Sequence, residues 1–384
     1  MTFTREEIEQ RGHPVWVEVD LDAIRHNIRT LATIASGAEV MGVVKGYAYG
    51  HGNPQSAQAM LDAGATRLGV ARVAEALHLR EAGIAAPTHV FTEPPPQAAA
   101  TLIEHDLTPA VYTHGFAEAL SAAAVRLGRD VGVHVKLDTG MHRVGLLSDA
   151  VPDAISSIAR LPGIRIEGLW SHLAVADQPD HPFNRKQLDL FAELVDRVAR
   201  AGIDVRYRHI ANSAATLSNP DSHHDLVRCG IAAYGLSPGP NVAPTADLHP
   251  ALALRARVNM TKNVPAGEAL SYGLRYAVDH DSRVVTVPAG YADGYDRRLS
   301  GRADVIIGGS RYTVSGTVCM DQFMVDVGHA QIEVGATATL LGAADGEAIT
   351  AEELASHIGT INYEITTRIP SRVPRVFVGA SDGA

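Results

Sequence analysis

The stretch EVMGVVK, residues 39–45, is the first of eight short apolar runs that recur at fairly even spacing through the first 235 residues. Most of these runs are rich in Val, Ile and Leu without strict alternation, a pattern typical of parallel strands buried on both faces. The other seven are RLGVA (67–71), THVFT (88–92), TPAVY (108–112), VGVHVKLD (131–138), RIEGLWSH (165–172), VRYRHIANS (205–213) and LVRCGIAAYG (226–235).

Helical periodicity fills several of the intervals between these runs. Apolar residues recur at helical spacing over residues 54–65, 72–83 and 184–202, and the first two segments stop at Gly64 and Gly83. In the longest segment the apolar face consists of Leu188, Phe191, Leu194, Val195 and Val198. Eight strands alternating with helices over about 200 residues predict an α/β fold that begins with a (β/α)8 barrel.

The texture of the sequence changes after residues 235–250, which contain four prolines and are typical of a linker. Beyond them, strand-like segments are separated by glycine turns, and one helix is predicted to start at Thr350, with Glu353 completing a capping box. We therefore predict a barrel over residues 1–245 and a mostly β C-terminal domain over residues 246–384.

Composition narrows the class of protein. Of the 384 residues, 46% are hydrophobic and 20% are charged, and the formal net charge is −10. An acidic chain is a poor candidate for sequence-independent binding of nucleic acid, which needs clustered cations. Two cysteines, no apolar N-terminal run and no apolar stretch of about 18 residues favour a cytoplasmic protein that does not act at a membrane.

Polar side chains cluster where the predicted barrel strands end, which is where such barrels carry their active sites. Lys45 ends a buried strand, and desolvation there would lower its pKa and suit it to Schiff-base chemistry. Ser213, Gly230 and Ile231 follow strands seven and eight, where barrels often bind phosphate. Arg228 lies within an apolar strand and must face a partner.

The remaining candidate residues can also be explained by ordinary structural roles. His172 fits a hydrogen-bonded core histidine, and Arg143 fits either a surface arginine or a fork for a carboxylate. Tyr272 and Tyr291 fit aromatic packing over a turn. The spacing of His, Cys and Asp residues indicates no metal site.

Nine motifs in order, between about residue 14 and residue 379, together resemble the alanine racemase family. They are VVKGYAYGHG (43–52), KLDTGMHRVG (136–145), WSHLAVAD (170–177), HIANSAAT (209–216), VRCGIAAYG (227–235), ALSYG (269–273), PAGYADG (288–294), GTVCMDQFMVDV (316–327) and INYEITTRIPSRVPRVF (361–377). The resemblance implies pyridoxal phosphate as cofactor, alanine as substrate and D-alanine for peptidoglycan as product. It also implies a homodimer whose active sites combine one subunit's barrel with the other's β domain.

The same resemblance implies a role for each site residue. Lys45 would hold the cofactor and act as one base, and Tyr272 of the second subunit would be the opposite base. Arg143, the Met320 backbone N–H and Tyr291 would bind or admit the substrate. Lys136 would form a carbamate that steadies Arg143. The cofactor would be bound by Tyr49, His172, Asn212, Ser213, Arg228, Gly230, Ile231 and Tyr363, and no metal is implied.

Of four alternatives, the sequence argues against three and leaves the fourth, a broad-specificity racemase, open. A barrel decarboxylase of basic amino acids would place a carboxylate, not Arg228, against the cofactor ring. A cofactor-free aldolase barrel would leave Tyr272 and Tyr363 without roles, and a cofactor carrier would not need the C-terminal domain. A broad-specificity amino-acid racemase has the same residues as an alanine racemase.

Overall fold

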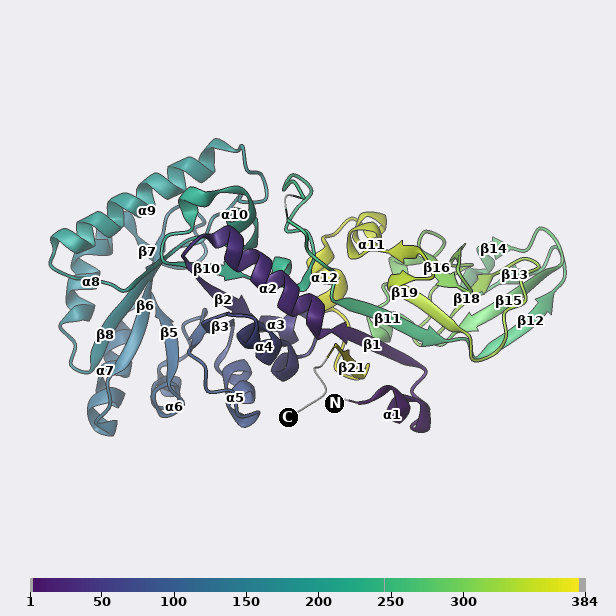
Figure 1. Cartoon of the computed structure of the whole chain (residues 1–384), viewed down its shortest axis with the longest axis horizontal. Helices are drawn as coiled ribbons and strands as arrows, with labels where there is room; N and C mark the ends of the chain where they lie inside the picture. Colours follow the sequence, from purple (N-terminus) through teal and green to yellow (C-terminus); the bar gives the residue numbers. More distant parts are fainter. Residues whose placement is uncertain (1–2, 245, 380–384) are drawn as a thin grey trace. The chain divides into compact units, whose positions relative to one another are not determined.

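The computed structural model describes residues 3–244 and 246–379, and these fall into two compact units (Figure 1). One unit, called here the barrel unit, contains residues 24–48 and 53–249. The other, called here the β unit, contains the described residues of 1–23, 49–52 and 250–384. The boundary predicted from sequence ends at residue 245, which lies outside the described residues. A single boundary in the sequence cannot separate the two units, because two N-terminal segments belong to the same unit as the C-terminal residues.

Eight parallel strands form the sheet of the barrel unit, in the order β10-β2-β3-β4-β5-β6-β8-β9. The first and last strands of this order are joined by backbone hydrogen bonds from Asp225 N to Arg208 O (3.2 Å) and from Arg228 N to Ala211 O (3.1 Å). The predicted eight-stranded barrel is confirmed. Its strands are β2 (Glu39–Val43), β3 (Arg67–Val70), β4 (Thr88–Val90), β5 (Leu107–Val111), β6 (Val131–Asp138), β8 (Ile164–Trp170), β9 (Tyr207–His209) and β10 (Leu226–Cys229), with the short β7 (Leu146–Leu147) beside β6.

Helices flank these strands (Figure 1). The three helices predicted from periodicity are present as α4, α5 and α9, and Gly64 and Gly83 follow the first two with positive φ angles of 106° and 82°. Val195 lies at the edge of the buried face of α9 rather than within it. The helices are α2 (Leu21–Ala35), α3 (Lys45–Tyr49), α4 (Asn53–Asp62), α5 (Val73–Glu81), α6 (Ala99–Glu104), α7 (His114–Leu127), α8 (Val151–Ala159), α9 (Pro182–Arg200) and α10 (Ser213–Ser218), with 3₁₀ turns η1 (Pro96–Ala98), η2 (Ser148–Ala150), η3 (Pro220–Ser222) and η4 (Ile231–Tyr234).

The β unit is mostly strand, as predicted, and its largest sheet runs in the order β17-β16-β19-β11-β1-β21, with β20 beside β19. Strands β12, β15 and β18 form a second sheet, and β13 pairs with β14. The strands are β1 (Val15–Asp20), β11 (Leu252–Arg257), β12 (Met260–Val264), β13 (Ala269–Leu270), β14 (Tyr276–Ala277), β15 (Ser282–Val287), β16 (Asp304–Ile307), β17 (Ser310–Thr313), β18 (Phe323–Asp326), β19 (Thr337–Ala344), β20 (Glu347–Ile349) and β21 (Arg375–Val378).

Short helices complete the β unit. They are α1 (Arg5–Gln10), α11 (Ala351–Ile358), α12 (Asn362–Thr367) and the 3₁₀ turns η5 (Tyr272–Leu274), η6 (Tyr291–Asp293) and η7 (Arg297–Leu299). The hydroxyl of Thr350 accepts the backbone N–H of Glu353 at 3.0 Å, so the predicted start of α11 is confirmed. The Glu353 carboxylate pairs with Arg311.

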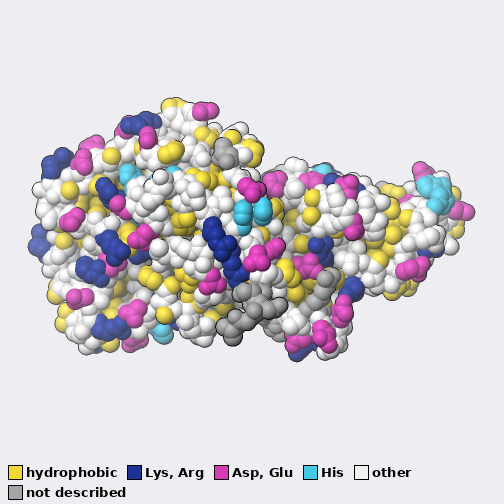
Figure 2. Space-filling model, viewed as in Figure 1, with side chains coloured by type: hydrophobic (Ala, Val, Ile, Leu, Met, Phe, Trp, Pro, Cys, Tyr) yellow, Lys and Arg dark blue, Asp and Glu magenta, His cyan; other side chains and the backbone are white. Residues whose placement is uncertain are grey.

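The surface drawn in Figure 2 carries Lys and Arg side chains interspersed with Asp and Glu side chains. Among the described residues, no helix combines the length and the apolar character that crossing a membrane requires.

Candidate active site

The predicted barrel residues lie at the carboxyl ends of the strands: Lys136 and Arg228 lie within β6 and β10, and the others follow a strand. Lys45 follows β2, Arg143 lies five residues beyond the end of β6, and His172 follows β8. Ser213 starts α10 after β9, and Gly230 follows β10, which contains Arg228. Because all eight strands are parallel, these carboxyl ends share one rim of the barrel.

Lys45 begins a turn of left-handed helix. Gly46, Tyr47, Ala48 and Tyr49 have φ angles of 63°, 57°, 53° and 53°, a conformation that costs about 1–2 kcal/mol per residue when a side chain is present. The carboxylate of Glu75 in α5 holds the turn, since it accepts the Gly46 N–H at 2.7 Å. Strain that is held in place by such contacts is a feature of functional sites.

The Lys45 amine is shifted toward its neutral form. Desolvation is the largest cause of its lowered pKa, and the charges of Arg143 and Arg228 lower it further, whereas Glu75 opposes the shift. A neutral amine is a nucleophile and a base, so the surroundings of Lys45 suit both roles.

Arg228 is a buried cation bonded to uncharged acceptors. Its Nη2 donates at 3.0 Å to the carbonyl oxygens of Ser171 and Ile210 and to Nδ1 of His172, and its Nη1 donates at 3.1 Å to Nδ1 of His209. Burial lowers its pKa to about 9, which still leaves it positively charged at neutral pH. Arg228 therefore places a buried positive charge at the rim, and none of these hydrogen bonds goes to a carboxylate.

A chain of buried histidines lies behind Arg228. His209 Nε2 lies 2.8 Å from His134 Nδ1, and His134 Nε2 lies 3.5 Å from Arg67. Burial, followed by the nearby cations and imidazoles, holds the pKa values of His134, His172 and His209 well below the ordinary range. Neutral imidazoles that accept from Arg228 at Nδ1 must carry their proton at Nε2, so His209 donates to His134.

The loop that carries Arg143 is held by the last residue of β6. Asp138 Oδ1 accepts the backbone N–H groups of Gly140 (2.9 Å) and His142 (3.0 Å). Lys136, two residues earlier, is 2% exposed, with its amine 4.3 Å from the centre of the Trp170 ring. Burial, with the charges of Arg228 and Arg143, lowers the Lys136 pKa to about 7.

The predicted phosphate-binding residues meet at one hydroxyl. Ser213 Oγ accepts the backbone N–H groups of Gly230 (2.9 Å) and Ala232 (3.3 Å), so the starts of α10 and η4 lie together. Ile231 lies between these two donors and is buried. Asn212 caps α10 by accepting the Ala215 N–H at 3.1 Å.

Hydrogen bonds to backbone carbonyls hold the loops that carry three predicted residues of the β unit. The Ala292 N–H, next to Tyr291, donates to the Met320 carbonyl at 3.0 Å. The Thr317 hydroxyl donates to the Tyr272 carbonyl at 2.9 Å. Tyr272, Tyr291 and Met320 are 73%, 43% and 54% exposed in the single chain. A side chain at Gly290 would lie 2.2 Å from the Met320 oxygen, so the approach of these loops requires glycine.

Tyr49 and Tyr363 also belong to the β unit, with their ring centres 6.1 Å apart. Burial, and then the proximity of Tyr363, raises the pKa of Tyr49. The segment that contains Tyr49 is fastened by Arg375, whose Nε and Nη2 donate to the Gly50 carbonyl at 3.1 and 2.8 Å.

The site residues predicted from sequence therefore form two groups. The barrel unit holds Lys45, Lys136, Arg143, His172, Asn212, Ser213, Arg228, Gly230 and Ile231, and the β unit holds Tyr49, Tyr272, Tyr291, Met320 and Tyr363.

Several supporting residues are missed by the sequence analysis. Glu75, His209 and Arg375 act through contacts with residues 19 to 325 positions away, which no local pattern reveals. Gln187 is a further example, because its buried amide donates to the His172 carbonyl and to Thr139 at 3.0 Å. The helical position of Gln187 on the mostly apolar buried face of α9, where Asn184 is the other polar residue, is a signal that could have identified it.

Comparison with known proteins covers nearly the whole chain. The family model described as alanine racemase, N-terminal domain, matches residues 19–238, and that described as alanine racemase, C-terminal domain, matches residues 251–377. The chain is 44% identical over 367 residues to the alanine racemase of Carboxydothermus hydrogenoformans, covering 95% of this chain and 100% of that protein.

Solved structures agree with this match. The crystal structure of alanine racemase from a D-cycloserine-producing Streptomyces lavendulae has a TM-score of 0.91 and 42% identity, covering 95% of this chain and 97% of that one. The histidine racemase of Leuconostoc mesenteroides has a TM-score of 0.88 and 28% identity, covering 95% and 98%. With both domain models matched in order along its length, the chain belongs to the alanine racemase family.

Proposed function

We propose that this protein interconverts L-alanine and D-alanine with pyridoxal phosphate as its cofactor. The observation that carries the proposal is Arg228, a buried guanidinium whose hydrogen bonds all go to uncharged acceptors. A guanidinium donates a hydrogen bond to a pyridine nitrogen without protonating it. That moderates electron withdrawal by the ring, which favours return of a proton over side reactions.

The residues of the barrel rim fit this cofactor by their chemistry. Lys45 supplies an amine with a lowered pKa for the aldehyde group, and Arg228 supplies the donor for the ring nitrogen. Ser213, Gly230 and Ile231 would hold the phosphate, and we assign Tyr49 and Tyr363 of the β unit to the same role because the family resemblance implies it. When bound, the cofactor withdraws electrons from the α-carbon of the amino acid and so makes its proton removable.

Racemisation needs one base on each face of the α-carbon. We assign Lys45 to the proton on the D side and Tyr272 to the proton on the L side. His172 accepts from Arg228 at Nδ1 and therefore presents Nε2–H, through which it would hold the Tyr272 oxygen and favour its ionised form. Tyr291 would narrow the entrance for substrate.

The substrate carboxylate would be bound by Arg143 and by the backbone N–H of Met320. Lys136 would steady Arg143 after reacting with carbon dioxide, since a neutral amine adds CO2 and releases a proton to give an anionic carbamate. The lowered pKa of Lys136, about 7, leaves a large neutral fraction at physiological pH.

We propose a homodimer with shared sites because Tyr272 is 73% exposed in the single chain, together with Leu274 and Met320. Large exposed apolar side chains gathered on neighbouring loops mark surfaces that a partner covers. A second copy would place its barrel rim against them, so that each site combines residues of two chains.

The product would supply D-alanine for peptidoglycan. A reducing compartment such as the cytoplasm agrees with Cys229 and Cys319, both of which are free thiols.

The test is to incubate the holoenzyme separately with L-alanine, L-serine, L-lysine and L-histidine and to measure each D-product by chiral chromatography. We expect D-alanine to form with the highest kcat/KM and Lys45→Ala to form none. Comparable rates on all four substrates would indicate a broad-specificity racemase. Release of carbon dioxide or absence of any D-product would exclude the proposed activity.

A further inference from the structure

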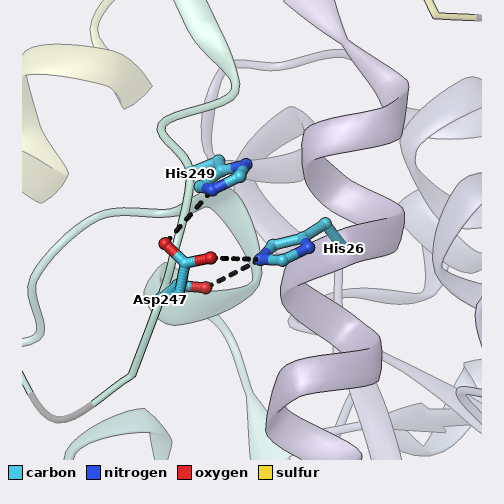
Figure 3. Close-up of side chains that lie close together, drawn as sticks. All are labelled: His26, Asp247 and His249. Carbon is cyan, nitrogen blue, oxygen red and sulfur yellow. Dashed lines mark hydrogen bonds and ion pairs between the residues drawn. The ribbon is translucent and has the colours of Figure 1, made fainter.

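Three side chains with metal-binding atoms meet on the surface of the barrel unit, apart from the racemase residues (Figure 3). His26 projects from α2, whereas Asp247 and His249 lie in the segment that ends this unit. The Asp247 carboxylate bridges the Nε2 edges of the two rings, with Oδ2 3.3 Å from His26 Nε2 and Oδ1 3.2 Å from His249 Nε2. His26 and Asp247 are 221 positions apart in the sequence. The fold therefore brings together possible metal ligands that no motif spacing in the sequence reveals.

The ligand atoms of the three residues lie within 4.8 Å of one another, close enough to be reached by a single metal ion. Zinc bound to imidazole nitrogen and carboxylate oxygen has bond lengths of about 2.0–2.2 Å, so two of its ligand atoms lie about 3.3–3.5 Å apart. Each histidine Nε2 lies at about that distance from the carboxylate, though from a different oxygen of it: His26 is 3.3 Å from Oδ2 and His249 is 3.2 Å from Oδ1. The rings are stacked, with centres 4.1 Å apart and planes 9° from parallel, and both turn Nε2 toward the carboxylate (Figure 3).

A buried residue holds the ligands in place. Asn27, next to His26 on α2, is fully buried, and its side chain brackets the main chain of His249. Its Oδ1 accepts the His249 N–H at 2.7 Å, and its Nδ2 donates to the His249 carbonyl at 2.9 Å. The same Nδ2 donates to the Ala233 carbonyl at 3.2 Å. Because the two ligand-bearing segments are already joined, a metal ion would bind a largely preformed site.

The donor set selects the class of ion. Two imidazole nitrogens and one carboxylate suit zinc, nickel and copper, whereas calcium and magnesium prefer oxygen ligands. The histidine side chains are 38% and 53% exposed, so an ion can enter from solvent and water can occupy a fourth position. His26 Nε2 now contacts the Asp247 carbonyl at 2.9 Å, and metal binding would replace the proton at that nitrogen.

We propose that His26, Asp247 and His249 form a binding site for one divalent transition-metal ion, Zn²⁺ in the first instance. A bound ion would join residues 247–249 to α2 and stabilise the end of the barrel unit. This site requires neither the cofactor nor the racemase residues.

The experiment uses the full-length holoenzyme, freed of metal with a chelator that is then removed. Zn²⁺ is titrated in competition with a chromophoric chelator, for wild type, His26→Gln, His249→Gln and the double variant. His114→Gln is the matched control, because His114 also faces a carboxylate, Glu118 at 3.3 Å, on an exposed helix surface. Among the described residues, His114 is not part of a group of three such ligands.

We expect one tight Zn²⁺ per chain in wild type and in His114→Gln, and affinity at least about tenfold weaker in each ligand variant. Zn²⁺ should raise the unfolding temperature of wild type and of the control but not that of the double variant. Circular dichroism without metal checks that all variants fold alike. Absence of tight binding to wild type, or equal binding by the double variant, would overturn the assignment.

Discussion

At the scale of single residues, the site depends on groups that set the state of Arg228 and Arg143. His209 is fully buried at the end of β9, where its Nδ1 accepts from Arg228 and its Nε2 contacts His134. This makes His209 a positioning residue, which acts through Arg228. His209 can accept this hydrogen bond at Nδ1 only when its ring is neutral. Burial favours the neutral ring because it lowers the pKa of His209.

Replacing His209 with Phe should lower kcat for alanine about tenfold or more, because a lost acceptor leaves Arg228 with an unpaired buried donor costing about 1–3 kcal/mol. His209→Asn, which restores an acceptor, should recover part of the rate. The cofactor absorption spectrum should shift in the Phe variant alone. The control is His89→Phe, a histidine buried in the same layer with its ring centre 5.8 Å from that of His209. Equal losses in both Phe variants would mean that His209 serves packing only.

The carbamate proposed at Lys136 is open to a direct spectroscopic test. The protein has four lysines, and protein equilibrated with ¹³C-bicarbonate should show one carbamate signal by NMR. Carbamate formation consumes the neutral amine and releases a proton, so the signal should grow from about pH 6 to pH 8 as Lys136 passes its pKa of about 7. Lys136→Arg should abolish the signal, and Lys186→Arg should preserve it. A signal that survives in Lys136→Arg would refute the assignment.

At the scale of elements, the left-handed turn after β2 is held by α5. Glu75 accepts the N–H groups of Gly46 (2.7 Å), Ala71 (2.8 Å) and Arg72 (3.0 Å), so one carboxylate fixes the turn and the start of its own helix.

Glu75→Ala should lower the free energy of unfolding by about 1–3 kcal/mol, since backbone donors in a strained segment lose a charged acceptor. Because Glu75 raises the pKa of Lys45, its removal should also shift the Lys45 pKa downward in the cofactor-free protein. Urea unfolding and reaction of the amine with an acylating reagent across pH measure the two effects. Glu81→Ala, at the exposed end of α5, should change stability by less than about 0.5 kcal/mol. If Glu75→Ala lowers the free energy of unfolding no more than Glu81→Ala does, Glu75 does not hold the turn.

Sequence patterns predict some elements well and miss others for a physical reason. The eight barrel strands are visible because burial on both faces leaves a continuous apolar run in each. The sequence does not assign β1 (Val15–Asp20) to the β unit. This strand belongs there because it pairs with Leu252–Arg257 and Arg375–Val378, at the other end of the chain. Likewise, Arg228 is predictable from a charge within an apolar strand and Lys45 from a charge that follows one, whereas His209 and Glu75 function through distant contacts.

At the scale of the whole molecule, we propose that each active site combines two chains. Lys45 belongs to the barrel unit, and Tyr272 belongs to the β unit and is 73% exposed in the single chain. A shared site requires Lys45 of one chain to work with the partner's β unit, and two inactive variants with defects in different units should then repair one another.

The most direct measurement is therefore complementation between Lys45→Ala and Tyr272→Phe. The two variants are dissociated reversibly, mixed in equal amounts and reassembled, with differently tagged chains to confirm exchange. Random pairing makes half of the dimers mixed, and each mixed dimer holds one site with both defects and one intact site. The account predicts recovery of roughly a quarter of the wild-type alanine racemisation. Persistent inactivity despite confirmed subunit exchange would contradict the shared site.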